Sequence, residues 1–152
     1  MKLSEHFTFE ELTDSHGHPD LVPQNRVEAQ GFIRQLTLTA QALEETRAIL
    51  GGYPMNINSG FRGPSLNRAV GGSATGAHPK GLAADTTPSN MSIDEAFDTL
   101  MQNIDQCPTI RKVIKEKVGK SVWLHIEARI SNDQPQQFYT TNDGRTYTEV
   151  YS

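Results

Sequence analysis

Cysteine is almost absent from the 152-residue chain, since Cys107 is the only one. No disulfide can form within the chain, and a zinc site built from several thiolates is excluded. Any metal must therefore be bound by histidine and carboxylate side chains. The chain also lacks an apolar run of the roughly 20 residues that a membrane-spanning helix needs, so we expect no membrane insertion.

Positive charge is not in excess, because 14 lysines and arginines face 18 acidic residues, for a formal net charge of −4. A nucleic-acid-binding domain normally carries a basic stripe, so nucleic acid is not an expected partner. Residues 1–6 contain no apolar segment of the kind found in signal peptides. We therefore expect a protein that is made in the cytoplasm and stays there unless something releases it.

The length suits one domain with one hydrophobic core, so we predict a single domain over residues 1–152 and expect a monomer. Phe7–Leu12 has the pattern of a short helix that is capped by Thr8 and Glu11. Residues 24–50 carry apolar side chains, Val27 among them, with a period of 3.6. This predicts a long amphipathic helix in which Gly31 could mark a break.

Later segments alternate apolar and polar residues as strands do. The predicted strands are residues 54–59, 81–87, 113–118 and 121–130, with the last two paired around Gly119 and Lys120. A final hairpin is predicted for residues 137–141 and 146–151, and two further helices at 64–70 and 90–104. Because helices come first and strands mainly later, we predict an α+β fold with a small antiparallel sheet flanked by helices.

A glycine-rich stretch carries His78 and Asp85, and His125 follows in an apolar strand pattern. A catalytic zinc usually has three protein ligands and one open position. Gly81 permits a sharp bend between the first two residues, and strand alternation places His125 and Glu127 on one face. The spacing allows a zinc site, although an ordinary structural role is the commoner explanation for each residue alone.

Two more histidines, His16 and His18, lie in a segment without helical or strand periodicity. A His-x-His pair can bind metal, but no carboxylate stands at ligand spacing here. We expect a solvated loop.

Residues 78–85 resemble the H-x-x-G-x-A-x-D signature of the zinc D-Ala-D-Ala carboxypeptidases and L-alanyl-D-glutamate endopeptidases, a group that also includes the zinc-binding domain of hedgehog proteins. Residues 3–12, 59–73 and 123–126 are similar to the branch that is common in phage and prophage genomes. The resemblance covers roughly residues 3 to 130. It implies a hedgehog/D-Ala-D-Ala peptidase-like fold.

The resemblance also implies that His78, Asp85 and His125 bind Zn²⁺. Arg62 would hold the substrate and stabilise the oxyanion of the tetrahedral intermediate, with a structural salt bridge as its alternative role. The implied activity is that of a hydrolase, a zinc metallopeptidase that cleaves peptidoglycan stem peptides as a D,D-carboxypeptidase or an endopeptidase. A phage or prophage protein of this kind would act as an endolysin at the cell wall after release.

The chain departs from the family pattern in two respects. Gly76 stands where the family usually has serine, so Ser73 or Thr75 is the predicted source of a substrate hydrogen bond. The general base of relatives lies three or two residues before the last histidine, where this chain has Val122 and Trp123; neither side chain can accept a proton.

Glu127 is the nearest carboxylate on the strand face of His125, and we predict that it is the base, with an orienting or surface role as the alternative. The missing family base leaves a second function open. The chain could be a zinc-bearing structural or binding module without turnover. A third hypothesis is that the chain is a virion or assembly protein with the same fold.

Overall fold

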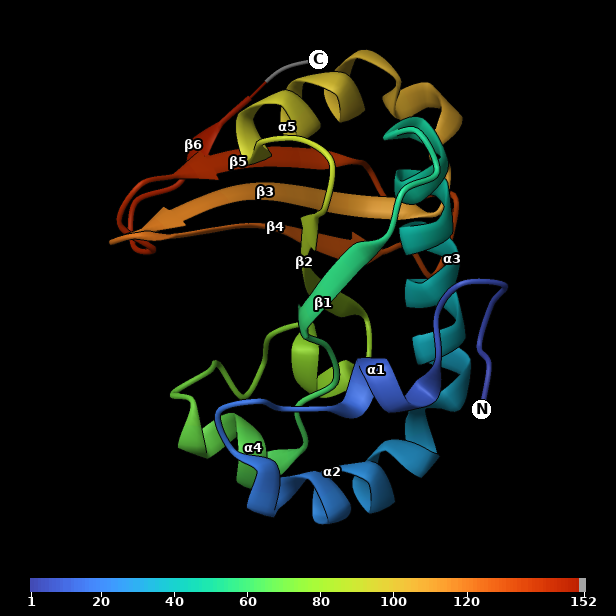
Figure 1. Cartoon of the computed structure of the whole chain (residues 1–152), viewed down its shortest axis with the longest axis vertical. Coiled ribbons are helices and arrows are strands. Elements are labelled where there is room, and N and C mark those ends of the chain that lie inside the picture. Colours follow the sequence, from blue (N-terminus) through green and yellow to red (C-terminus); the bar gives the residue numbers. More distant parts are fainter. Residues whose placement is uncertain (151–152) are drawn as a thin grey trace.

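The computed structural model describes residues 1–150, which fold around a six-stranded sheet with the strand order β1-β2-β4-β3-β5-β6 (Figure 1). The strands are β1 Met55–Ser59, β2 Ala83–Pro88, β3 Ile110–Val118, β4 Ser121–Ala128, β5 Gln137–Thr141 and β6 Thr148–Glu149. The α-helices are α1 Phe9–Thr13, α2 Val22–Ala29, α3 Ile33–Ile49, α4 Pro64–Ala69 and α5 Ile93–Gln102. Short 3-10 helices lie at Pro19–Leu21, Gln30–Phe32, His78–Lys80 and Ile104–Gln106.

The predicted fold class is confirmed, since helices flank a mainly antiparallel sheet. In Figure 1, α1, α2 and α4 gather at the lower end of the molecule, α5 lies at the upper end and α3 runs along one side. None of the helices in residues 1–150 combines the length and the apolar character that crossing a bilayer requires.

One strand pair departs from the antiparallel prediction, because β3 and β5 run parallel. Antiparallel pairing brings the end of β4 beside the start of β3, where Ala128 is paired with Ile110. The chain then passes to the other edge of β3 and enters β5 at that same end, with Gln137 opposite Lys112. β5 and β6 form the predicted hairpin; its predicted end at Tyr151 lies outside the described residues.

The helix predicted over residues 24–50 is two helices, α2 and α3, with Gly31 in the 3-10 segment between them. In α3, Leu36, Ala40 and Leu43 are completely buried, as their spacing predicts. Val27 in α2 is 66% exposed, so its assignment to the buried stripe was wrong. A single helical period cannot continue through the break, and α2 therefore presents a different set of residues to the core.

The core lies between α3, α5 and one face of the sheet. Leu124 and Ile126 of β4 are fully buried on this face, together with Val113 of β3. Strand alternation turns the intervening residues of β4 to the opposite face. Cys107 also lies in the core with no exposed surface, and burial raises the pKa of its thiol to about 11, with the charges of nearby acidic side chains adding to the effect.

Asn25 of α2 connects three backbone segments. Its Nδ2 donates to the carbonyls of Thr13 and Phe61 at 2.9 and 3.0 Å, and its Oδ1 accepts from the N–H of Gly63 at 2.7 Å. The side chain is 1% exposed, so water cannot replace it. It therefore determines the path of the chain on both sides of Arg62.

We expect Asn25→Ala to lower the free energy of unfolding by about 2–3 kcal/mol, because it leaves buried backbone groups without partners. Urea denaturation measures the change. Asn58→Ala is the matched control, since the exposed Asn58 amide donates only to Thr87 Oγ1 at 2.8 Å. An equal loss of stability in the two variants would contradict the assigned role of Asn25.

Candidate metal centre

The three residues predicted to bind zinc meet at the middle of the sheet. Asp85 of β2 is directly opposite His125 of β4 in the antiparallel register, and His78 comes from the 3-10 helix that precedes β2. One donor atom of each lies within 4.8 Å of the other two. Asp85 Oδ1 is 3.0 Å from His125 Nδ1 and 3.5 Å from His78 Nε2. Within residues 1–150 this is the only such group of three.

The ring of His78 is oriented by a backbone carbonyl. Its Nδ1 lies 2.7 Å from Gly60 O, which can only accept, so Nδ1 donates there and Nε2 is the nitrogen that faces Asp85. Such a hydrogen bond behind a ligand is usual for histidines that bind metal. Gly60 must be glycine here, because a Cβ would lie 2.4 Å from Leu12 O.

The bend predicted at Gly81 is confirmed. Gly81 has a φ of 72°, in the left-handed region, and ends the 3-10 helix that carries His78. Its carbonyl accepts a hydrogen bond from Thr39 Oγ1 of α3 at 2.7 Å. The turn between the two candidate ligands is thereby attached to the core.

The ring of His125 lies between two carboxylates. Its Nδ1 faces Asp85, and its Nε2 is 2.7 Å from Glu127 Oε2. Burial alone would lower the pKa of His125, but the hydrogen bonds to Asp85 and Glu127 raise it to about 10. Burial would raise the pKa of Asp85, yet the charge of His78 and the hydrogen bond from His125 hold it well below its usual range.

Two imidazole nitrogens and one carboxylate oxygen are a donor set that suits zinc. The residues therefore fit a Zn²⁺ ion, with His78 Nε2, Asp85 and His125 Nδ1 as the atoms that would hold it.

A cleft of about 350 Å³ opens beside these residues, between residues 73–79 and the sheet. Arg62, Ser73 and Tyr147 are among the residues that line it. Thr75, the other predicted source of a substrate hydrogen bond, lines a neighbouring cleft instead, and its hydroxyl lies 3.2 Å from that of Ser73.

Arg62 lines the same cleft as the three candidate ligands. Burial lowers the pKa of its guanidinium, while the negative charges of Asp85 and Glu116 oppose this effect. Among the described residues Arg62 forms no ion pair, and its Nε is buried without a hydrogen-bond partner. The alternative role in a structural salt bridge is therefore not observed, and the guanidinium is available to a ligand.

Gly76, which replaces the family serine, lines the same cleft. A Cβ built at this position would meet Ser73 O at 3.4 Å and Ser73 Cβ at 3.6 Å, which are ordinary contacts. The backbone at position 76 thus has room for a Cβ atom.

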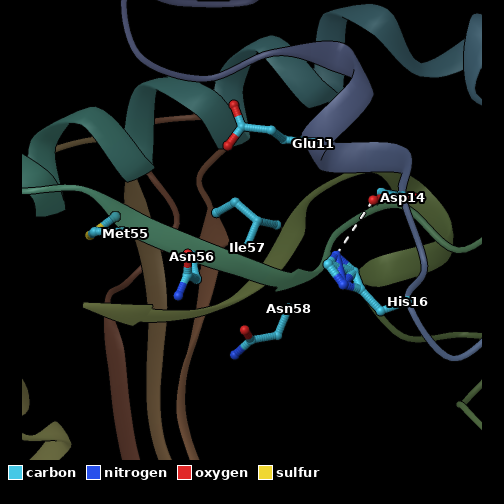
Figure 2. Close-up of a pocket in the computed structure, with 7 residues that line it drawn as sticks. All are labelled: Glu11, Asp14, His16, Met55, Asn56, Ile57 and Asn58. Atoms are coloured by element: carbon cyan, nitrogen blue, oxygen red, sulfur yellow. Dashed lines mark ion pairs between the residues drawn. The ribbon is translucent and has the colours of Figure 1, made fainter. Parts of the chain in front are cut away.

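A second cleft, of about 530 Å³, lies along β1 near the loop histidines (Figure 2). His16 faces Asp14 there, with 3.5 Å between Nε2 and Oδ2. The Glu11 carboxylate in this cleft already accepts from the backbone and hydroxyl of Thr8 in the predicted capping box. His16 is exposed and His18 is partly exposed, as the loop prediction expects.

The sequence analysis missed one residue of the cleft beside His78, Asp85 and His125. Glu116 of β3 lies opposite Trp123 of β4, and its Oε2 accepts a hydrogen bond of 2.9 Å from the indole Nε1. Burial raises the pKa of its carboxyl group; the nearby His125 opposes this effect, whereas the charge of Asp85 adds to it. Gly119 and Lys120 form the predicted turn between these strands, so the register that a two-residue hairpin imposes was the signal that could have revealed Glu116 opposite Trp123.

The model of the family described as Peptidase M15 matches residues 5–107. The matched segment contains Arg62, His78 and Asp85, and it ends before Glu116 and His125. A search of the curated proteins finds no match.

Proposed function

The chain belongs to the Peptidase M15 family, and on this premise we propose that it is a zinc-dependent peptidase that cleaves the stem peptides of peptidoglycan. The observation that supports this most is the convergence of His78, Asp85 and His125 beside an open cleft. Zinc bound by these side chains would lower the pKa of water toward about 7 and polarise the scissile carbonyl.

The residues of the cleft have separate tasks in this proposal. The planar guanidinium of Arg62 would bind the carbonyl or carboxylate oxygen of the substrate and stabilise the negative charge that develops on it. The Ser73 hydroxyl would donate to the peptide backbone of the substrate. Tyr147 is 46% exposed beside the same cleft, where its ring can contact a bound peptide.

Both a D,D-carboxypeptidase and an endopeptidase are compatible with this set of residues. We propose a phage or prophage setting in which the protein acts as an endolysin, after release from the cytoplasm. The similarity of residues 3–12, 59–73 and 123–126 to phage-type relatives supports this setting.

The activity is tested by digesting purified peptidoglycan with zinc-loaded protein, with and without a chelator, and identifying the fragments by mass spectrometry. We expect cleavage that the chelator abolishes and that added zinc restores. Loss of one terminal D-Ala identifies a carboxypeptidase, whereas a new amino terminus within the stem identifies an endopeptidase. Intact stem peptides in every sample would contradict the proposal.

The second candidate is a zinc-bearing binding module without turnover. It is favoured by Val122 and Trp123, which occupy the positions where relatives carry the general base. This candidate predicts one zinc ion per chain, a folded protein and no cleavage in the same assay.

A further inference from the structure

We propose that Glu116 is the general base of the peptidase reaction and that Glu127 orients His125. This inference rests on the proposed peptidase function. It assigns the proton transfer to a strand other than the one on which the sequence predicts it.

The register of the sheet places Glu116 next to the candidate metal ligands. β3 and β4 pair Ile114 with His125 and Glu116 with Trp123. Because alternate residues share a face of a strand, Glu116 lies on the face that carries His125, one row away on the neighbouring strand. Diagonal neighbours of this kind are within reach of long side chains, and Glu116 and His125 line the same cleft.

The Glu116 carboxylate has one oxygen held and one oxygen free. Oε2 accepts the hydrogen bond from the Trp123 indole at 2.9 Å. Within residues 1–150 no hydrogen bond or ion pair to Oε1 is formed. A carboxylate that is fixed through one oxygen can present the other to a water molecule in a constant position, as a general base requires.

Glu127 is committed to other contacts. Its Oε2 lies 2.7 Å from His125 Nε2, and its side chain is also near Arg111 Nη1 at 3.7 Å and Lys112 Nζ at 3.9 Å. Each of its two carboxylate oxygens therefore already faces an N–H group. A carboxylate on the far nitrogen of a metal-binding histidine fixes the orientation of the ring and strengthens it as a ligand. The position of Glu127 suits this second task.

In the proposed step, Glu116 takes one proton from the attacking water, whose oxygen forms a bond to the scissile carbonyl carbon. When the carbon–nitrogen bond breaks, Glu116 gives this proton to the leaving nitrogen, which departs as an amine. The other product is a carboxylic acid, and Glu116 returns to its starting charge. Water is the only co-reactant.

The two glutamates are distinguished by Glu116→Gln and Glu127→Gln, with Glu5→Gln at an exposed site as the matched control. We expect Glu116→Gln to keep wild-type zinc content and wild-type binding of the peptide, while kcat falls by about 10²–10⁴-fold. Glu127→Gln should weaken zinc binding by about 10–100-fold, with kcat largely recovered at saturating zinc. Glu5→Gln should match the wild type in all three measurements.

A spectroscopic readout is independent of turnover. Trp123 is the only tryptophan, so the protein has a single indole N–H resonance. This resonance should shift strongly in Glu116→Gln and little in Glu127→Gln, because only Glu116 accepts from the indole.

The outcomes separate the two proposals. No cleavage by zinc-loaded wild-type protein would overturn the peptidase function and the role of Glu116 together. Cleavage by the wild type with kcat of Glu116→Gln within about threefold would overturn the role of Glu116 alone, since loss of a general base costs at least about 100-fold. Loss of zinc from Glu116→Gln would also overturn the role of Glu116 as the base. The same conclusion would follow if, at saturating zinc, kcat fell in Glu127→Gln but not in Glu116→Gln.

Discussion

Replacement of His78 by alanine is expected to remove stoichiometric zinc binding and, with it, cleavage of peptidoglycan. His78 Nε2 is one of three candidate donors, and its ring is already oriented by Gly60 O, so its removal leaves only two of the three candidate ligands. We expect zinc affinity to fall by more than the roughly 100-fold that loss of an outer-shell contact can cost. Elemental analysis and competition with a chromophoric chelator measure the loss.

His16→Ala is the matched control for this prediction. His16 is an exposed histidine that faces only Asp14, and it should be replaceable without loss of zinc. Thermal unfolding provides a second measurement, because a ligand at about 1,000 times its Kd stabilises the folded state by about 4 kcal/mol. Zinc should therefore raise the Tm of the wild type and of His16→Ala and leave that of His78→Ala unchanged. Full zinc content in His78→Ala would contradict the assigned site.

The second large effect is expected at Arg62. Among the described residues, Arg62 is the only arginine that lines the cleft beside His78, Asp85 and His125. Its replacement by alanine removes a donor to the developing oxyanion, and such a loss costs about 10²–10³-fold in kcat. Lysine keeps the charge but lacks the planar fork, so Arg62→Lys should recover little of this loss. Steady-state kinetics on a defined stem peptide would give kcat and KM for both variants.

Arg68→Ala serves as the control for Arg62, since Arg68 is exposed in the last turn of α4 and does not line the cleft. Its kinetic constants should equal those of the wild type. Zinc content should be unchanged in all three arginine variants, because none of them alters a candidate ligand. Wild-type kcat in Arg62→Ala would exclude a role of this side chain in the reaction.

The family resemblance implies that His78, Asp85 and His125 act together, and local features of the chain explain why the fold brings them to one place. His78 and Asp85 are joined by one short turn, and the alternation of β4 alone decides which face His125 occupies. The same alternation led to Glu127, which does lie beside His125. The alternation along β4 does not, however, indicate which side chains of the neighbouring strand β3 lie beside His125.

Glu116 and β5 show this limit. The position of Glu116 depends on the register of β3 against β4. The sequence predicts this pair of strands, but the general base was sought only along the strand that carries His125. The direction of β5 depends on where the loop of residues 129–136 leaves the sheet, which no local pattern encodes. The exposure of Val27 likewise follows from the change of direction between α2 and α3, and not from the apolar character of the residue.

The isolation of Cys107 has a practical consequence. A thiol without exposed surface, with its pKa raised to about 11, offers almost no thiolate to an alkylating reagent at neutral pH. Cys107 can therefore be alkylated only when the core opens transiently. The rate of alkylation then depends on the free energy of that opening. With no second thiol in the chain to compete, a single mass increment on the intact protein follows the opening. Any ion that binds the protein only while the core is closed will therefore slow the alkylation of Cys107.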